Sequence, residues 1–258
     1  MVYKVIEYRV EADVAVITLN RPEVMNALNT QMRAEILDAI GHGAAEARAL
    51  VLTGAGRAFC SGQDLGDRVS TASHDLERVL RDEYEPMLKA ITDCPIPTIA
   101  AVNGAAAGAG ANLALAADVV IASETAMFLQ AFARIGLIPD AGGTYWLPRQ
   151  MGLAKAMGAA LFAEPISARQ AADWGMIWEA VPEDRFEAQW RARARHLAEG
   201  PTATYTRLKQ ALRASFDNDL DTQLALEAHL QGECGESRDF KEGVVAFLEK
   251  RKARFEGR

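Results

Sequence analysis

The sequence predicts an α/β fold in which most strands pair in parallel. Short apolar segments alternate with segments of helical periodicity through the first half of the chain. The internal apolar segments end in glycine-containing loops, and α/β proteins bind ligands at loops of this kind. From about residue 145 onward the pattern is mainly helical. We therefore expect a core at residues 1–200 and a helical region at residues 201–258, divided near Gly200-Pro201.

The individual elements follow from hydrophobic periodicity. Residues 3–8 and 14–19 alternate around a turn at 11–13, which predicts a hairpin. Short apolar segments predict further strands at 49–53, 96–102, 119–122 and 176–181. Apolar positions three and four residues apart predict helices at 30–47, 75–92, 111–117, 151–162, 167–174, 184–199, 202–215, 219–232 and 238–249.

Composition excludes several classes of protein. The 258 residues carry a net charge of −7 and a pI of about 5.2, which argues against nucleic-acid binding. The cysteines at 60, 94 and 234 are odd in number and widely spaced, so we expect neither disulfides nor a metal site. The N-terminus lacks the layout of a signal peptide, and proline and glycines interrupt the most apolar segment, 96–117. We therefore expect a cytoplasmic protein with no membrane partner.

Two glycine-rich loops could approach a ligand through their backbones. They span 54–65 and 103–112, and the second runs into a predicted helix. Small residues permit close approach, and N–H groups at a helix N-terminus favour negative charge. One N–H from each loop could bind a single oxygen and form an oxyanion hole. Tight helix packing is the other interpretation of either loop. Neither loop matches a P-loop or a dinucleotide-binding fingerprint.

Asp140 lies between Pro139 and the pair Gly142-Gly143, in otherwise apolar surroundings. Burial among apolar groups raises the pKa of a carboxyl group, and this suits proton transfer near neutral pH. The simpler interpretation is that Asp140 caps a helix that begins near Ala141.

The motifs together resemble the crotonase (enoyl-CoA hydratase/isomerase) superfamily, over nearly the whole chain. They are NRP at 20–22, NALN at 26–29, GRAFCSGQDL at 56–65, NGAAAGAG at 103–110 and GLIPDAGGT at 136–144. The resemblance implies a crotonase-like spiral of ββα units with a helical C-terminal region, assembled as a homotrimer or a dimer of trimers. It also implies an acyl-CoA thioester substrate and no cofactor, because coenzyme A is part of the substrate.

The same resemblance implies site residues. The backbone amides of Ser61 and Ala109 are expected to hold the thioester oxygen while an enolate forms. The adenine contacts of the family fall at Val24, Gln63, Asp64 and Leu65, although Asp64 could equally stabilise a turn. A basic residue of the C-terminal helix, often from a neighbouring subunit, contacts the CoA phosphate in the family. Lys250 is the candidate here, within a basic C-terminus that could equally be a solvated tail.

The resemblance favours isomerisation over hydration. Hydratases of the superfamily carry two glutamates that activate water, and these positions correspond to Asn112 and Phe132 here. Asp140 stands where many hydratases have glycine and some isomerases have aspartate. The segments 132–140, 171–178 and 247–255 resemble a subfamily that isomerises ring epoxides to oxepins, and 3-enoyl to 2-enoyl groups, on CoA thioesters. We therefore predict catalysis by Asp140, Ser61 and Ala109.

Three alternatives stay open from the sequence. The first is an enoyl-CoA hydratase of fatty-acid or aromatic degradation. The second is a haloaryl-CoA dehalogenase, in which Asp140 would attack as a nucleophile beside a histidine such as His74 or His229. The third is a non-catalytic scaffold that binds acyl-CoA or RNA, although the acidic pI opposes RNA.

Overall fold

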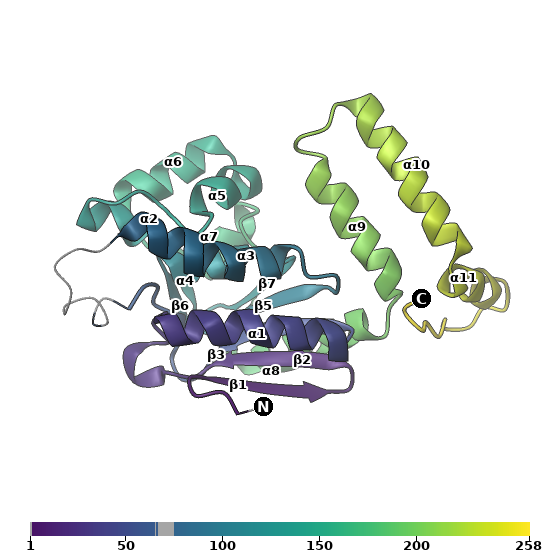
Figure 1. Ribbon diagram of the computed structural model, residues 1–258, viewed down its shortest axis with the longest axis horizontal. Coiled ribbons are helices and arrows are strands. Elements are labelled where there is room, and N and C mark those ends of the chain that lie inside the picture. The colour runs from purple at the N-terminus through teal and green to yellow at the C-terminus, as the bar shows by residue number, and fades with distance from the viewer. Residues whose placement is uncertain (1, 65, 67–74) are drawn as a thin grey trace.

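A computed structural model describes residues 2–64, 66 and 75–258 (Figure 1). Within these residues a six-stranded sheet has the order β1-β2-β3-β5-β7-β10. β1 and β2 pair antiparallel, and the other neighbours pair in parallel. The strands are β1 (Ile6–Glu11), β2 (Val14–Leu19), β3 (Ala49–Gly54), β5 (Thr98–Val102), β7 (Val119–Ser123) and β10 (Glu179–Val181).

The N-terminal hairpin begins and turns later than the sequence predicts. β1 extends to Glu11, and Ala12 and Asp13 alone form the turn, with φ angles of 49° and 61°. Two successive residues with positive φ suit a two-residue hairpin turn, because its twist matches that of the strands. Helix α1 (Thr30–Glu46) agrees closely with the predicted 30–47. Its N-cap is Asn29, whose side chain accepts a hydrogen bond from the Met32 amide.

A second sheet was not predicted and completes the spiral of ββα units. Its order is β4-β6-β8-β9, built from β4 (Ala58–Cys60), β6 (Ala105–Ala107), β8 (Met127–Leu129) and β9 (Ile166–Ser167). β3, β5 and β7 of the large sheet are each followed by a short strand of the small sheet and then by helical structure. These strands have only two or three residues each and lack a readable period, and the first two lie within the glycine-rich loops of the sequence.

Glycine allows the sharp corners between the two sheets. A Cβ atom on Gly54 would lie 2.4 Å from the Ala58 carbonyl oxygen, and one on Gly104 would lie 2.1 Å from that of Arg57. Both distances are far inside van der Waals contact, so no larger residue fits these corners without moving the backbone. The corners therefore fix the direction of the loops that carry the predicted site.

Both faces of the large sheet are buried. Val14, Val16 and Ile121 face helix α8 (Glu183–Ala198), which packs through Phe186 and Trp190. The alternate residues of the strands join the main core, together with α1 and the helices listed next. These are α2 (Leu76–Val79), α3 (Glu85–Thr92), α4 (Ala109–Leu115), α5 (Gly143–Met151), α6 (Leu153–Phe162) and α7 (Ala168–Asp173).

Two helical predictions need correction. The predicted helix 75–92 consists of α2, a π-helical turn at Leu80–Tyr84 and α3. Helix α5 is absent from the helices predicted by periodicity, because Gly142-Gly143 and Pro148 resemble breakers in the sequence; it appears only in the interpretation of Asp140 as a cap. In the structure Gly142 takes the left-handed N-cap position, and Pro148 lies inside the helix.

The C-terminal helices extend away from the core (Figure 1). They are α9 (Thr202–Ala214), α10 (Leu220–Glu236) and α11 (Arg238–Leu248). The chain enters α9 through Pro201, so the predicted division at 200/201 coincides with a helix start, and it stays a prediction as a domain boundary. Within the described part of the chain, no helix is both long and apolar enough to cross a membrane.

The projecting helices expose many large apolar side chains. On this arm they include Leu208, Leu212, Phe216, Leu220, Leu224, Phe240, Phe247 and Leu248. Many exposed large apolar side chains on one arm are typical of an interface. The predicted homotrimer or dimer of trimers stays a prediction.

Candidate active site

The first glycine loop is held in shape by Asn26, from the N-terminal motif. Asn26 is fully buried, and its Nδ2 donates to the carbonyl oxygens of Ala55, Ala58 and Phe59 at 2.9, 2.8 and 3.2 Å. Its Oδ1 accepts from the Arg21 amide at 2.9 Å. One buried amide thus satisfies the backbone of a segment that turns sharply between the sheets.

The two glycine loops lie against each other. A Cβ atom on Gly110 would lie 2.3 Å from the Cys60 carbonyl oxygen, and one on Gly62 would lie 2.8 Å from that of Ala107 and 3.4 Å from the Ala109 nitrogen. Glycine at both positions therefore permits the contact. The structure brings the neighbourhoods of Ser61 and Ala109 together, as an oxyanion hole requires.

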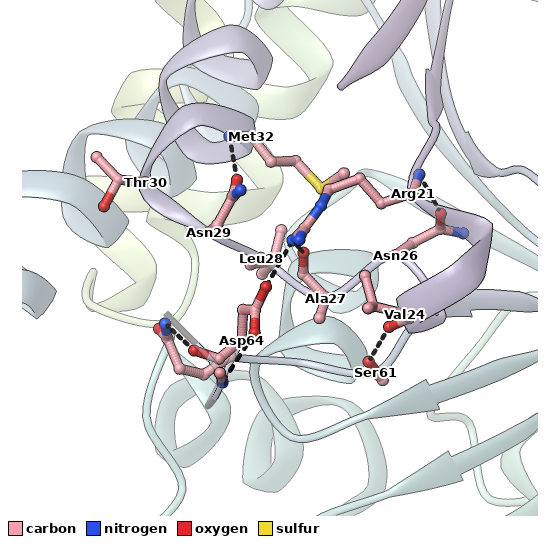
Figure 2. Close-up of polar contacts among 12 residues, drawn as sticks. Arg21, Val24, Asn26, Ala27, Leu28, Asn29, Thr30, Met32, Ser61 and Asp64 are labelled. Atoms are coloured by element: carbon pink, nitrogen blue, oxygen red, sulfur yellow. Dashed lines mark hydrogen bonds and ion pairs between the residues drawn. The ribbon is translucent and has the colours of Figure 1, made fainter. Parts of the chain in front are cut away.

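Ser61 is engaged within the chain. Its amide donates to the Met25 carbonyl oxygen at 2.9 Å. Figure 2 shows the second bond, in which its hydroxyl donates to the Val24 carbonyl oxygen at 3.2 Å. A thioester oxygen would have to share or replace the first of these bonds. Ala109 is the first residue of α4, where N–H groups and the helix dipole favour an anion. The roles of Ser61 and Ala109 stay predictions.

The residues predicted to contact adenine differ in exposure and in their hydrogen-bond partners. Val24 is 37 % exposed. Asp64 accepts from Arg21 Nη1 at 2.7 Å, which ties the two motifs together (Figure 2). The Gln63 side chain instead turns inward, where its Oε1 accepts from the Tyr84 hydroxyl at 2.6 Å and from Arg33 Nη1 at 3.2 Å. Leu65 lies outside the described residues.

Lys250 is not part of this cluster within one chain. It is exposed and follows α11, which Figure 1 shows at the opposite end of the molecule from β6 and α2. Neighbouring basic residues are ion-paired: Arg251 with Glu242 at 2.6 Å and Lys252 with Glu199 at 2.6 Å. Contact of Lys250 with a CoA phosphate requires another subunit and stays a prediction.

Asp140 lies on a tight turn just before α5. The two residues that follow it, Ala141 and Gly142, have positive φ angles of 49° and 81°. Because the helix begins at Gly143 and its N-cap is Gly142, Asp140 does not occupy the capping position. The Asp140 carbonyl oxygen accepts from the Gly143 amide at 2.8 Å and from Asn112 Nδ2 at 2.7 Å. The turn that carries the carboxylate is thus fixed through its backbone.

The two positions at which superfamily hydratases have glutamates hold other groups in an ordered arrangement. Asn112 is fully buried, and its Oδ1 accepts from Gln130 Nε2 at 2.9 Å. Phe132 is 7 % exposed, and its ring lies 3.7 Å from the place of a Cβ atom on Gly108. A buried amide committed to hydrogen bonds and a phenyl ring are poor groups for activating water.

Asp140 lines a large cavity between the core and the C-terminal arm. Its volume is about 1510 Å³, and its walls come from α3, α5 and α9. Aromatic side chains of the lining include Tyr84, Tyr145 and Trp146. Burial raises the pKa of Tyr84, and the charge of Asp140 adds to that rise, so the phenol stays a proton donor. Other carboxylates, such as Asp217, also line the cavity.

The cysteines provide a simple chemical test of this packing. Burial raises the pKa of the Cys60 thiol to about 12, and Cys94 is also buried. Cys234 is partly exposed on α10. Because the thiolate is the reactive form, we expect Cys234 to react with a colorimetric disulfide reagent at pH 8 long before the other two. The number of thiols that react with the reagent should be one in the native protein and three after denaturation. Rapid reaction of Cys60 in the native protein would contradict the packing under the first loop.

The remaining sequence candidates lie elsewhere. His229 is on α10, 70 % exposed and 3.3 Å from Glu233, and His74 lies outside the described residues. A histidine beside Asp140, as the dehalogenase alternative needs, is therefore not found in the part of the chain that the structure describes. In the same residues no group of three or more His, Cys, Asp or Glu side chains is placed to hold a metal ion.

Comparison with known proteins identifies the family of this chain. A family model described as enoyl-CoA hydratase/isomerase matches residues 9–258. The chain belongs to this family. It is 64 % identical over 258 residues to a "Probable enoyl-CoA hydratase" of Rhodobacter capsulatus, covering 100 % of both chains. It is 46 % identical over 254 residues to the 1,2-epoxyphenylacetyl-CoA isomerase of Escherichia coli, covering 96 % of this chain and 97 % of that protein.

The solved structures confirm the crotonase fold. An enoyl-CoA hydratase from Bacillus anthracis superposes with a TM-score of 0.94 at 30 % identity, covering 99 % of this chain and 100 % of that one. The α/β spiral of ββα units with a helical C-terminal region is thus confirmed by both architecture and comparison. The matches include hydratases and an isomerase, so family membership leaves the reaction open.

The sequence analysis missed the polar residues that support the site. Tyr84 had only helical periodicity, which does not distinguish a core aromatic from one beside a carboxylate. Asn112 was considered only as a missing glutamate. Its position inside the apolar segment 109–115 carried a signal, because a buried amide must find hydrogen-bond partners.

Proposed function

We propose that this family member is an acyl-CoA isomerase that moves one proton through Asp140. The observation that supports this most strongly is the group of residues next to the two glycine loops. Asp140 stands on a fixed turn beside an aromatic cavity, while Asn112 and Phe132 occupy the positions of the water-activating glutamates. The proposed site has a proton carrier and lacks that pair of glutamates.

In the proposed reaction Asp140 removes a proton from C2 of a 3-enoyl-CoA. The electrons move into the thioester and give a dienolate, whose oxygen the amides of Ser61 and Ala109 would stabilise. The Asp140 carboxylic acid then returns the proton to C4, which leaves a 2-enoyl-CoA and a carboxylate. The reaction neither adds nor removes water, so its atoms balance without a co-reactant.

The proposed substrates include a ring 1,2-epoxide of phenylacetyl-CoA as well as 3-enoyl-CoA esters. The E. coli relative is named as an isomerase of that epoxide. Asp140 would take a proton from the acyl C2, the ring carbon–carbon bond of the epoxide would break as the ring expands, and the same proton would return to a ring carbon. The product is the isomeric oxepin, and the same amides would hold the enolate oxygen in between. The aromatic walls at Tyr84, Tyr145 and Trp146 suit a planar six-carbon ring.

Hydration of a 2-enoyl-CoA is the second candidate. The relative with 64 % identity is named a probable enoyl-CoA hydratase, and that similarity favours this reaction. A hydratase here would need a base other than the two glutamates. Among the predicted site residues, the Asp140 carboxylate is the candidate for that base.

Product analysis of the wild-type protein distinguishes the two reactions. The protein is incubated in deuterated water with 3-hexenoyl-CoA and, separately, with 2-hexenoyl-CoA, and the products are identified by mass spectrometry. We expect 2-enoyl product from the first ester and little 3-hydroxyacyl product from the second. Rapid formation of 3-hydroxyhexanoyl-CoA from 2-hexenoyl-CoA, with no double-bond migration in 3-hexenoyl-CoA, would refute the isomerase and support the hydratase.

A further inference from the structure

Asn112 stands at one of the positions where superfamily hydratases have a glutamate, and its side chain bonds to the backbone of Asp140. We propose that Asn112 and Gln130 form a positioning pair that fixes the peptide of Asp140 and thereby aims its carboxylate. This inference rests on the proposed isomerase function. It adds two residues that do not touch substrate but act through Asp140.

The hydrogen bonds of the pair have only one possible direction. The Asp140 carbonyl oxygen can only accept, so the atom of Asn112 that lies 2.7 Å from it must be the amide nitrogen. Asn112 Oδ1 is then left to accept, and Gln130 Nε2 donates to it at 2.9 Å. Both side chains are buried, at 0 and 1 % exposure. A reversed amide at either residue would place two acceptors, or two donors, against each other.

The turn after Asp140 needs such support. Ala141 is not a glycine, yet it has a φ of 49°, which costs about 1 kcal/mol or more. Residues in this conformation persist where their surroundings hold them. With the Gly143 amide and Asn112 both bonded, the two lone pairs of the Asp140 carbonyl oxygen are used. Its peptide cannot rotate without breaking two buried hydrogen bonds.

A substitution at Gly143 can test the contact between Asn112 and Asp140 independently. A Cβ atom at this position would lie 2.4 Å from Asn112 Nδ2 and 2.9 Å from its Cγ. Gly143 has no positive φ, so alanine would not strain the backbone there. Gly143→Ala therefore displaces the Asn112 amide without removing any polar group.

The test compares Asn112→Ala, Asn112→Asp and Gly143→Ala with the wild type on 3-hexenoyl-CoA. Asn112→Asp keeps the volume and the acceptor for Gln130 but replaces the donor with a carboxylate oxygen. Ser123→Ala is the matched control, because it removes another buried polar group, at 1 % exposure, at the end of β7. Turnover is expressed per site that binds CoA ester, and melting temperature is measured for each variant.

We expect kcat to fall by about 10- to 100-fold in all three test variants while KM changes by less than about threefold, because misplacing a catalytic group by about 1 Å costs up to this much. Ser123→Ala should retain wild-type kcat. Hydrogen exchange of the peptide covering 136–143 should accelerate in the test variants. If these variants lose melting temperature but keep kcat per binding site, Asn112 is structural and the inference is overturned. Absence of isomerase activity in the wild type would instead overturn the proposed function on which it rests.

Discussion

Asp140→Asn is expected to lower isomerase turnover by about two to four orders of magnitude. Asparagine has the same shape but cannot accept the proton, and general acid–base transfer typically contributes about 10²–10⁴-fold. The turn should survive, because Asn112 and Gly143 both bond to the backbone oxygen of residue 140, which the substitution keeps. The measurement is kcat on 3-hexenoyl-CoA together with the dissociation constant of a non-isomerising acyl-CoA.

The binding measurement separates chemistry from recognition. We expect the dissociation constant to stay within about threefold of the wild-type value, since the proposed role of Asp140 is proton transfer. Asp173→Asn, the same chemical change at an exposed position at the end of α7, is the control and should be silent. If Asp140→Asn keeps the wild-type kcat, Asp140 takes no part in the mechanism.

The second large effect concerns the attachment of the C-terminal arm. Asp118 joins α9 to the sheet: its Oδ2 lies 2.7 Å from Lys209 Nζ, and its Oδ1 lies 2.6 Å from Arg213 Nη2. The Thr98 amide and hydroxyl donate to the same carboxylate at 2.8 and 2.9 Å. The Asp118 and Lys209 side chains are only 14 and 11 % exposed. Removing one partner of such a pair leaves charge buried without compensation.

We therefore expect Asp118→Ala to lower the free energy of unfolding by about 3 kcal/mol, at the low end for a broken buried ion pair. The low end is appropriate because Lys209 also donates to the Cys94 and Ile96 carbonyl oxygens. Denaturant titration gives the energy, and limited proteolysis near residues 200–205 reports loosening of α9.

Lys252→Ala is the matched control for the arm. It breaks an ion pair with Glu199 in which the lysine is 84 % exposed, and such pairs contribute less than about 1 kcal/mol. Equal destabilisation by the two substitutions would contradict the proposed attachment of α9 through the ion pairs of Asp118. Unchanged proteolysis in Asp118→Ala would show that the arm is held by other contacts.

Local pattern determined the long elements of the fold. The strands of the large sheet and helices such as α1 and α8 were predicted within a few residues, because their apolar positions repeat over a whole element. The second sheet was missed because β4, β6 and β8 have only three residues each. Such strands form because the corner at Gly104 and its counterpart at Gly54 direct the chain there, which is a tertiary effect.

The sequence likewise predicted some features of the candidate site and not others. Motif order and the aspartate after Pro139 predict which segments carry the site, and the structure places 60–62 against 107–110. The sequence did not indicate that the Ser61 amide bonds to Met25 or that Gln63 turns toward Tyr84. Lys250 follows α11, and Figure 1 shows α11 at the far end of the helical arm that extends away from the core.

The sequence by itself determined the family, the fold class and the residue types that can perform the chemistry. These depend on periodicity, on glycines at corners and on motif spacing, all of which are properties of the chain order. Only the tertiary structure decided that Asn112 supports Asp140, 28 positions away. A hydrogen bond requires two atoms within about 3 Å, and that distance is set by packing of α4 against the turn before α5, which no local pattern encodes.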